Sequence, residues 1–178
     1  MLQHAPAIPA LIVAIWAGVL DWRYRRIPNW LTVSGAAVGV ALNTILYRWP
    51  GLKAALLGVA LALAVLLPFV LIRSLGAGDW KLAGALGACL GPHQIVTVLV
   101  LTIFAAGVLA LAVVIWMGRL KRTLLNIGRM VAALFSLRLP GPEVSLDNPE
   151  STKIPWGVAM ALACVFYVIA DAWGKVWG

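Results

Sequence analysis

The chain has 178 residues, of which 63% are hydrophobic and only 11% charged, and its mean hydropathy is +0.98. This composition indicates an integral membrane protein, because a helix needs about 20 apolar residues to cross roughly 30 Å of hydrocarbon. The length predicts one domain, residues 1–178, and excludes a membrane part joined to a separate soluble enzyme. The net charge of +8 would suit nucleic acid, but its distribution along the chain indicates membrane topology instead.

Six apolar segments follow one another along the chain, near residues 5–22, 30–47, 54–72, 79–91, 94–117 and 154–174. We therefore expect an all-α membrane fold with about six transmembrane helices, the fourth of them short and either half-buried or tilted. The first segment has no Lys or Arg before it and three Arg just after it, which is the reverse of a signal peptide. It should remain as the first helix, with its N-terminus outside.

A polar stretch at residues 118–153 separates the fifth and sixth segments and forms the predicted cytoplasmic loop. In its first part, apolar residues recur at helical spacing opposite scattered arginines, which predicts an amphipathic helix lying in the membrane interface. Its second part is rich in proline and carries Glu143, Asp147 and Glu150. For these three acids we favour a solvated linker over a substrate-binding role.

The basic residues divide unequally if successive connections alternate between the two sides of the membrane. One side receives only Arg48, Lys53 and Lys175, and the other is predicted to be cytoplasmic because it receives the larger share. Contact with anionic membrane lipids is expected on that side, and no nucleic-acid partner is needed. The cytoplasmic set is Arg23, Arg25, Arg26, Arg73, Lys81, Arg119, Lys121, Arg122, Arg129, Arg138 and Lys153.

Two of the six acidic residues, Asp21 and Asp79, border apolar segments on the predicted inner side. Three of the others lie in the loop, and Asp171 lies near the outer C-terminus. A carboxylate at the middle of a transmembrane helix costs about 2.5 to 3.5 kcal/mol, and less near its end. Acids in this position are therefore candidates for function.

Each polar residue near these acids also has a structural interpretation. Asp79 could cap the N-terminus of the fourth helix, and Asp21 could pair with one of the three arginines that follow it. Asn29 could cap the second helix, and Lys81 could act only as an anchor at the membrane surface. Taken singly, these structural interpretations are favoured over catalysis.

Three short stretches, taken together and in order, favour a catalytic interpretation. They are "DWRYRRIPN" at residues 21–29, "GAGDWKL" at 76–82 and "KIPWGVAMA" at 153–161. This ordered set resembles the type IV prepilin peptidases, the GxGD class of membrane-embedded aspartyl proteases, in the short form that serves Flp/Tad pilus systems. The supporting residues of these motifs are Ile27, Pro28, Asn29, Gly76, Gly78, Lys81, Leu82, Pro155 and Gly157.

The resemblance implies that Asp21 and Asp79 are the catalytic pair. The ionised carboxylate would take a proton from water while the protonated one donates to the scissile carbonyl. The implied substrate is a prepilin or pseudopilin in the prokaryotic inner membrane, with a short basic leader in the cytoplasm. Long members of the family carry a cytoplasmic insertion with paired CxxC motifs linked to methylation. This chain has none, so methyltransferase activity is not expected.

No metal or other cofactor is expected, because Cys89, Cys164, His4 and His93 show no metal-ligand spacing. Two alternative functions remain open. A small proton-coupled transporter could use both acids as proton sites, although both lie near one face and no internal repeat is present. A non-enzymatic assembly subunit would leave both acids dispensable. The sequence does not predict the oligomeric state.

Overall fold

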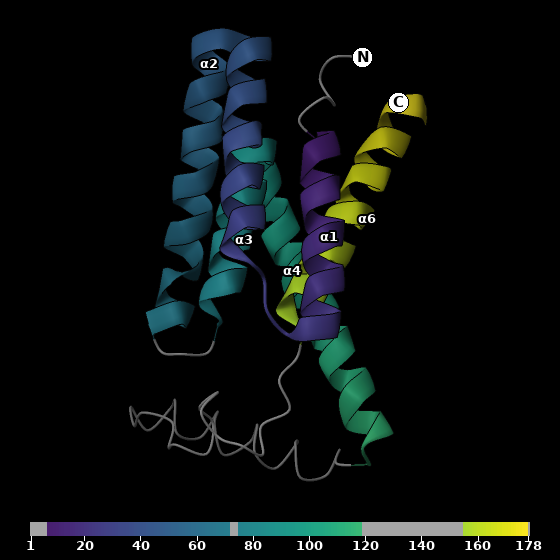
Figure 1. Ribbon diagram of the computed structural model, residues 1–178. Helices are drawn as coiled ribbons and strands as arrows, with labels where there is room; N and C mark the ends of the chain where they lie inside the picture. The colour runs from purple at the N-terminus through teal and green to yellow at the C-terminus, as the bar shows by residue number, and fades with distance from the viewer. Residues whose placement is uncertain (1–6, 72–74, 119–154, 178) are drawn as a thin grey trace, which may run out of the picture. The chain divides into compact units, whose positions relative to one another are not determined.

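The computed structural model describes residues 7–71, 75–118 and 155–177, and these residues form five α-helices and no strand (Figure 1). All of the helices except α3 are long and apolar enough to cross a membrane. The all-α membrane class is therefore confirmed, whereas the predicted amphipathic loop helix lies outside the described residues. The helices are α1 (Ala7–Tyr24), α2 (Asn29–Leu71), α3 (Ala77–Leu90), α4 (Pro92–Trp116) and α6 (Trp156–Trp177).

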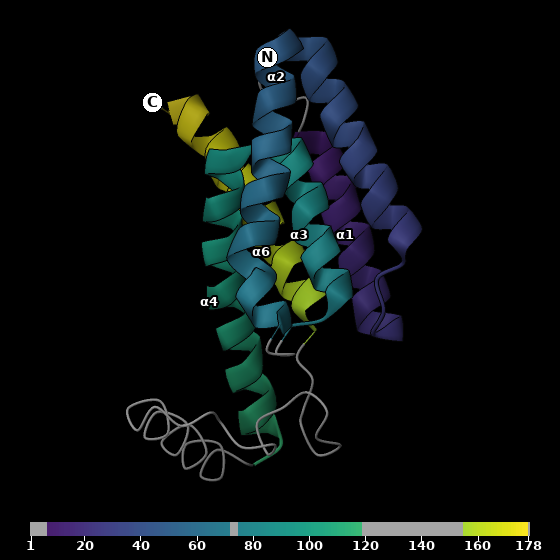
Figure 2. The same cartoon turned by 90° about the vertical axis from the view of Figure 1, so that its left-hand side faces the viewer.

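Helix α2 consists of two helical limbs. Arg48 interrupts it with φ 55° and ψ −136°, outside the helical region, and Pro50 follows. Figures 1 and 2 show the two limbs side by side and joined at one end. A straight helix of this length would measure about 65 Å, roughly twice the thickness of the hydrocarbon core. The limbs match the predicted segments 30–47 and 54–72, and the total of six crossings stays a prediction.

The chain divides into two compact units, one made of Met1–Ala106 and Pro155–Gly178 and the other of Gly107–Ile154. Most of the second unit lies outside the described residues, so the single domain at residues 1–178 stays a prediction. The helix packing and the candidate site described below lie within the first unit.

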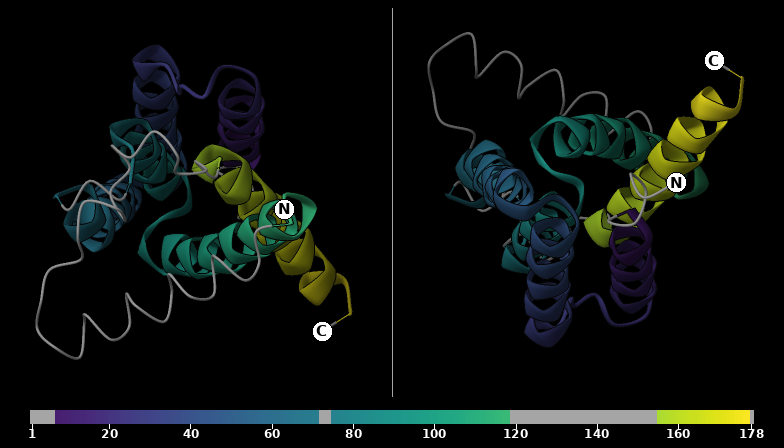
Figure 3. Two further views of the ribbon diagram at one scale, coloured as in Figure 1. Left: turned by 90° about the horizontal axis from the view of Figure 1, so that it is seen from below. Right: turned by 90° about the horizontal axis from the view of Figure 1, so that it is seen from above.

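Helix α3 packs mainly against α2, and α1 packs mainly against α6. Helix α1 also contacts α2 and α3, as the views along the helices show (Figure 3). The closest approach involves Gly58 of α2 and Gly87 of α3, because a Cβ atom on either would collide with the backbone carbonyl of the other. Small residues thus let α3, although short, lie deep among longer helices.

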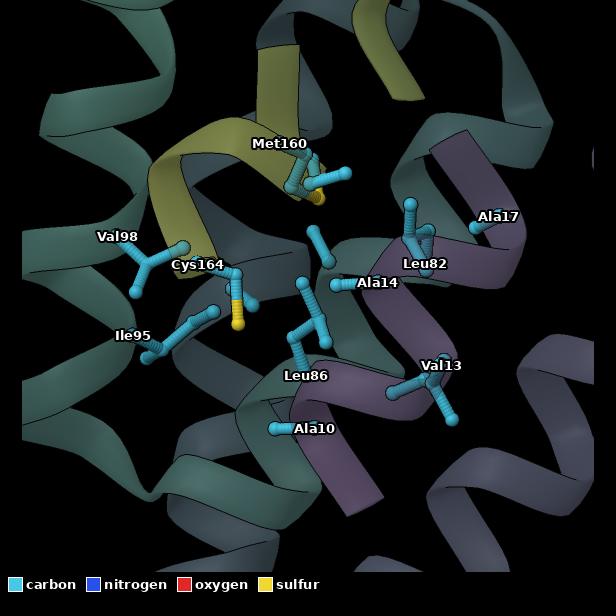
Figure 4. Packing of buried hydrophobic residues seen from close by; sticks show 14 of the residues in the cluster. Ala10, Val13, Ala14, Ala17, Leu82, Leu86, Ile95, Val98, Met160 and Cys164 are labelled. Atoms are coloured by element: carbon cyan, nitrogen blue, oxygen red, sulfur yellow. The ribbon is translucent and has the colours of Figure 1, made fainter. Parts of the chain in front are cut away.

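A cluster of buried apolar residues joins α1, α3 and α6 (Figure 4). Leu82 and Leu86 of α3 and Met160 of α6 have no exposed surface. Large apolar side chains such as Ile45, Leu71 and Trp173 are more than two-thirds exposed. Exposure of this kind is expected where helices face lipid.

One buried polar residue ties α2 to the C-terminal end of α3. The side-chain amide of Asn43 donates to the carbonyl oxygens of Gly39, Ala88 and Cys89, each at 3.0 Å. Carbonyls in the last turn of a helix lack intrahelical donors, so a buried partner must supply them. Asn43 therefore fixes α3 at the end opposite Asp79.

Candidate active site

The two predicted acids lie at ends of helices that meet at one end of the first unit. Asp21 lies in the last turn of α1, and Asp79 lies in the first turn of α3. Helix α2 begins at Asn29 and helix α6 begins at Trp156, beside Gly157. The end of α1 and the starts of α3 and α6 lie at the lower end of the bundle in Figure 1.

Asp21 is buried, with 8% of its surface exposed, and lies directly against the start of α6. Its Oδ2 atom accepts a hydrogen bond of 2.9 Å from the backbone N–H of Gly157. The backbone N–H of Val158 also interacts with this carboxylate. A Cβ atom at position 157 would lie 2.8 Å from Cβ of Asp21, which is too close. Only glycine therefore allows this contact without a shift of α6.

Asp79 is half-buried near the start of α3, a helix too short to cross a membrane. Asp79 is not the N-cap residue of this helix, because Gly76 occupies that position. The Asp79 carboxylate instead reaches back to the N–H of Gly76, as the third helical residue does in a capping box. A Cβ atom on Gly76 would lie 3.0 Å from Oδ2 of Asp79.

The carboxylates of Asp21 and Asp79 are close enough to interact electrostatically. Burial, followed by the charge of Asp21, raises the pKa of Asp79 from 3.8 to about 7, and the Gly76 hydrogen bond opposes this rise. Of the three arginines after Asp21, Arg25 places a charge near its carboxylate. The Arg23 guanidinium lies over the Tyr24 ring, 5.7 Å from the ring centroid. The site thus combines two interacting acids with the nearby cation Arg25.

Lys81 links the first two sequence motifs. Its ammonium group donates a hydrogen bond of 3.0 Å to Oδ1 of Asn29, which is the first residue of α2. The interpretation of Lys81 as a membrane anchor alone is therefore incomplete. This bond ties the start of α2 to the turn of α3 that carries Asp79.

The remaining motif residues pack around the same helix ends. A Cβ atom on Gly78 would lie 3.4 Å from Cβ of Ile27, so the two motifs are in contact there. The Pro28 carbonyl accepts a hydrogen bond from Leu31 N–H at 3.2 Å, in the first turn of α2. Leu82 is fully buried in the core beneath. Pro155 is also buried, immediately before α6.

Sequence reasoning missed the contact made by Trp80. Its indole N–H donates a hydrogen bond of 2.8 Å to the carbonyl of Leu63, in the second limb of α2. The signal was a tryptophan next to Asp79, since a half-buried indole N–H needs an acceptor. Trp80 thereby holds α3 against the second limb of α2.

No group of three or more His, Cys, Asp or Glu side chains that could hold a metal ion occurs among the described residues. Cys89 and Cys164 are buried free thiols, His93 is exposed, and His4 lies outside the described part of the chain. A cavity of about 520 Å³, lined in part by Asn43 and Asp171, contains none of the predicted site residues. The cavity therefore lies apart from the acid pair.

The helices and the site define a helical membrane protein with a pair of interacting carboxyl groups at one end of the bundle. Residues 8–111 match the type IV leader peptidase family, and this match covers more than half of the chain. The chain therefore belongs to the type IV leader peptidase family. The matched residues include Asp21 and Asp79 but not Gly157. No match was found among curated proteins or among solved structures.

Proposed function

We propose that this protein is an aspartic endopeptidase that removes the short basic leader from prepilins or pseudopilins. The observation that carries the proposal is the electrostatic interaction of Asp21 with Asp79, at helix ends that meet, in a chain of the leader peptidase family. We place the reaction at the cytoplasmic face of the prokaryotic inner membrane, on the basis of the basic-residue count. The resemblance to the family form that lacks a CxxC insertion supports Flp/Tad-type prepilins as substrates and peptidase activity without methyl transfer.

The proposed chemistry uses one water molecule between the two carboxyl groups. The ionised carboxylate takes a proton from water as its oxygen attacks the scissile carbonyl carbon, and the protonated partner donates to the carbonyl oxygen. The C–N bond then breaks as the first carboxyl gives its proton to the leaving amine. The second carboxylate takes a proton from a hydroxyl of the gem-diol intermediate, so both groups return to their starting states. Both carboxyls are needed, because one group cannot give and take a proton in the same step.

The surroundings of Asp79 suit an extended substrate. A helical prepilin segment must unwind before cleavage, because its hydrogen-bonded carbonyls are hidden from a nucleophilic water. Gly76 is exposed and carries no side chain, so the backbone at this position beside Asp79 leaves room for a substrate strand. No metal takes part in this scheme, so we expect cleavage to persist in EDTA.

The proposal is tested by co-expression with a Flp-type prepilin, with loss of the leader measured as a shift on a gel. Asp21→Asn and Asp79→Asn should each lower the cleavage rate by at least 10²-fold, since general acid–base catalysis contributes roughly 10²–10⁴-fold. The matched controls Asp171→Asn and Glu143→Gln should cleave normally. Robust cleavage by either variant of the acid pair would exclude this mechanism, and loss only in those variants separates the peptidase from an assembly subunit.

The transporter alternative predicts a different result in the same strains. A transporter that uses both acids as proton sites would leave the prepilin at full length in wild-type cells. Proton uptake into vesicles, abolished by the same two substitutions, would then support transport.

A further inference from the structure

The two acids of the candidate site have different hydrogen-bond environments. The Asp21 carboxylate accepts the N–H of Gly157 at 2.9 Å, interacts with the N–H of Val158, and lies near the positive charge of Arg25. The Asp79 carboxylate has one backbone N–H, that of Gly76. Donors and cations favour a charged carboxylate, whereas the repulsion between the two acids is mutual and does not distinguish them.

We infer that Asp21 is the ionised base of the pair, that Asp79 carries the proton and acts as the acid, and that Gly157 is the positioning residue that keeps Asp21 charged. This inference rests on the proposed peptidase function and deepens it. It also gives a specific role to the last of the three sequence motifs, which the family match does not include.

Other charges around the pair do not reverse this assignment. Each carboxyl faces the first turn of a helix, Asp21 that of α6 and Asp79 that of α3, so the positive ends of helix dipoles favour both anions. The Lys81 ammonium is bonded to Asn29. The two charged residues of α2, Arg48 and Lys53, lie at its kinked end.

The other charged residues in the described part of the chain show no interaction with the pair. Arg23 lies over the Tyr24 ring, and Arg26 is exposed in the connection between α1 and α2. Asp171, the one acid on α6, is about 20 Å further along that helix than Gly157. The unequal count of N–H donors and the Arg25 charge therefore distinguish the two acids.

Gly157 is suited to this role by its missing side chain. A Cβ atom there would meet Cβ, Cγ and Oδ2 of Asp21 at 2.8, 3.1 and 3.0 Å. Gly157→Ala must therefore push the start of α6 away from Asp21, which lengthens the N–H···O contact. The substitution weakens the stabilisation of the Asp21 anion and removes no titratable group.

The pH dependence of cleavage distinguishes which acid is ionised. If Asp21 is the anion of the singly protonated pair, it is charged both before and after the second proton leaves. Weakening the hydrogen bond from Gly157 to Asp21 then disfavours only the loss of the first proton, from the doubly protonated to the singly protonated pair. The acidic limb of the rate profile should move up by about one to two pH units, with the alkaline limb unchanged. If Asp79 is the anion instead, the alkaline limb moves and the acidic limb stays.

The experiment measures initial cleavage rates of the purified full chain against pH for wild type, Gly157→Ala and Gly174→Ala. Gly174 lies on the same helix with open space around its Cα, so its alanine variant should keep the wild-type profile. Movement of the acidic limb in Gly157→Ala alone supports the inference. Movement of the alkaline limb, or a lower rate at every pH with both limbs in place, overturns it.

A second measurement does not depend on the fold of Gly157→Ala or on cleavage. At about pH 6, an ordinary Asp with a pKa near 3.9 is ionised, so the infrared C=O band of a protonated carboxyl reports the pair. The band should be present in wild type. It should be absent in Asp79→Asn, where the N–H donors and the Arg25 charge keep Asp21 ionised, and present in Asp21→Asn, where Asp79 has a single N–H donor. The reverse pattern overturns the assignment. If the protein shows the expected infrared pattern but cleaves no prepilin, the proposed function is refuted. The assignment of the proton to Asp79 and of the charge to Asp21 then still stands.

Discussion

At the scale of single residues, Asp79 links the pH of the medium to the stability of the fold. Its pKa of about 7, against 3.8 for a free side chain, means that the folded chain binds more protons than the unfolded chain between these values. The free energy of unfolding must therefore fall as the pH rises from about 4 to about 7.

Asp79→Asn removes this titration and should raise the melting temperature at about pH 8 by a few degrees, with little change at about pH 4. The gain is limited because Asp79 keeps part of its contact with solvent. Thermal unfolding in detergent, followed by circular dichroism, measures it, with Asp171→Asn as the control. A lower melting temperature of Asp79→Asn at the alkaline pH would contradict this account.

The hydrogen bond from Lys81 to Asn29 supplies a second prediction at this scale. Lys81→Met and Asn29→Ala should each lower the cleavage rate by up to roughly tenfold, because the first turn of α3 loses a tie worth about 1 kcal/mol. If the two residues act through this bond, the cleavage rate of the double variant should be no lower than that of either single variant.

The control for these Lys81 and Asn29 variants is Lys53→Met. Lys53 is also on the helical surface, but its ammonium lies over the Trp49 ring, far from the acid pair. Its loss should leave the cleavage rate unchanged. Additive effects of Lys81→Met and Asn29→Ala would mean that they act independently.

At the scale of helices, the close contact between α2 and α3 depends on glycine. Gly87→Ala should destabilise the protein by about 1–3 kcal/mol, because its Cβ would collide with the backbone of Gly58 and force the helices apart. Gly107→Ala, in α4, has open space around the new methyl group and should be neutral or slightly stabilising. Thermal unfolding of both variants in one detergent tests this, and equal melting temperatures would contradict it.

At the scale of the whole molecule, cysteine labelling reports the orientation of the chain in the membrane. A cysteine placed near Ser145 should be shielded from an impermeant thiol reagent in intact cells, and one near Pro50 should be labelled. The native Cys89 and Cys164 are buried and should contribute little background. Labelling only at Ser145 would place the acid pair on the side away from a cytoplasmic leader.

The sequence alone determined the membrane class of the protein and singled out Asp21 and Asp79 as candidate site residues. It also predicted the short helix that the structure shows as α3. These follow from local properties: runs of apolar residues set helices of given length, and acids are so few that their positions at helix ends stand out. The ordered motifs also indicated the family, which the match over residues 8–111 confirmed. The limits of the helices were close to those predicted, with α3 at Ala77–Leu90 against residues 79–91.

The tertiary structure alone decided which polar groups meet. The N–H of Gly157 reaches Asp21 across 136 positions of the chain, Lys81 reaches Asn29 across 52, and Asn43 reaches Cys89 across 46. Such pairs depend on how helices pack and on which small residues let them approach, and one sequence read locally does not specify this. For the same reason, Asp79 could be singled out from the sequence as an acid, but its difference from Asp21 follows only from the groups that the fold places around each carboxyl.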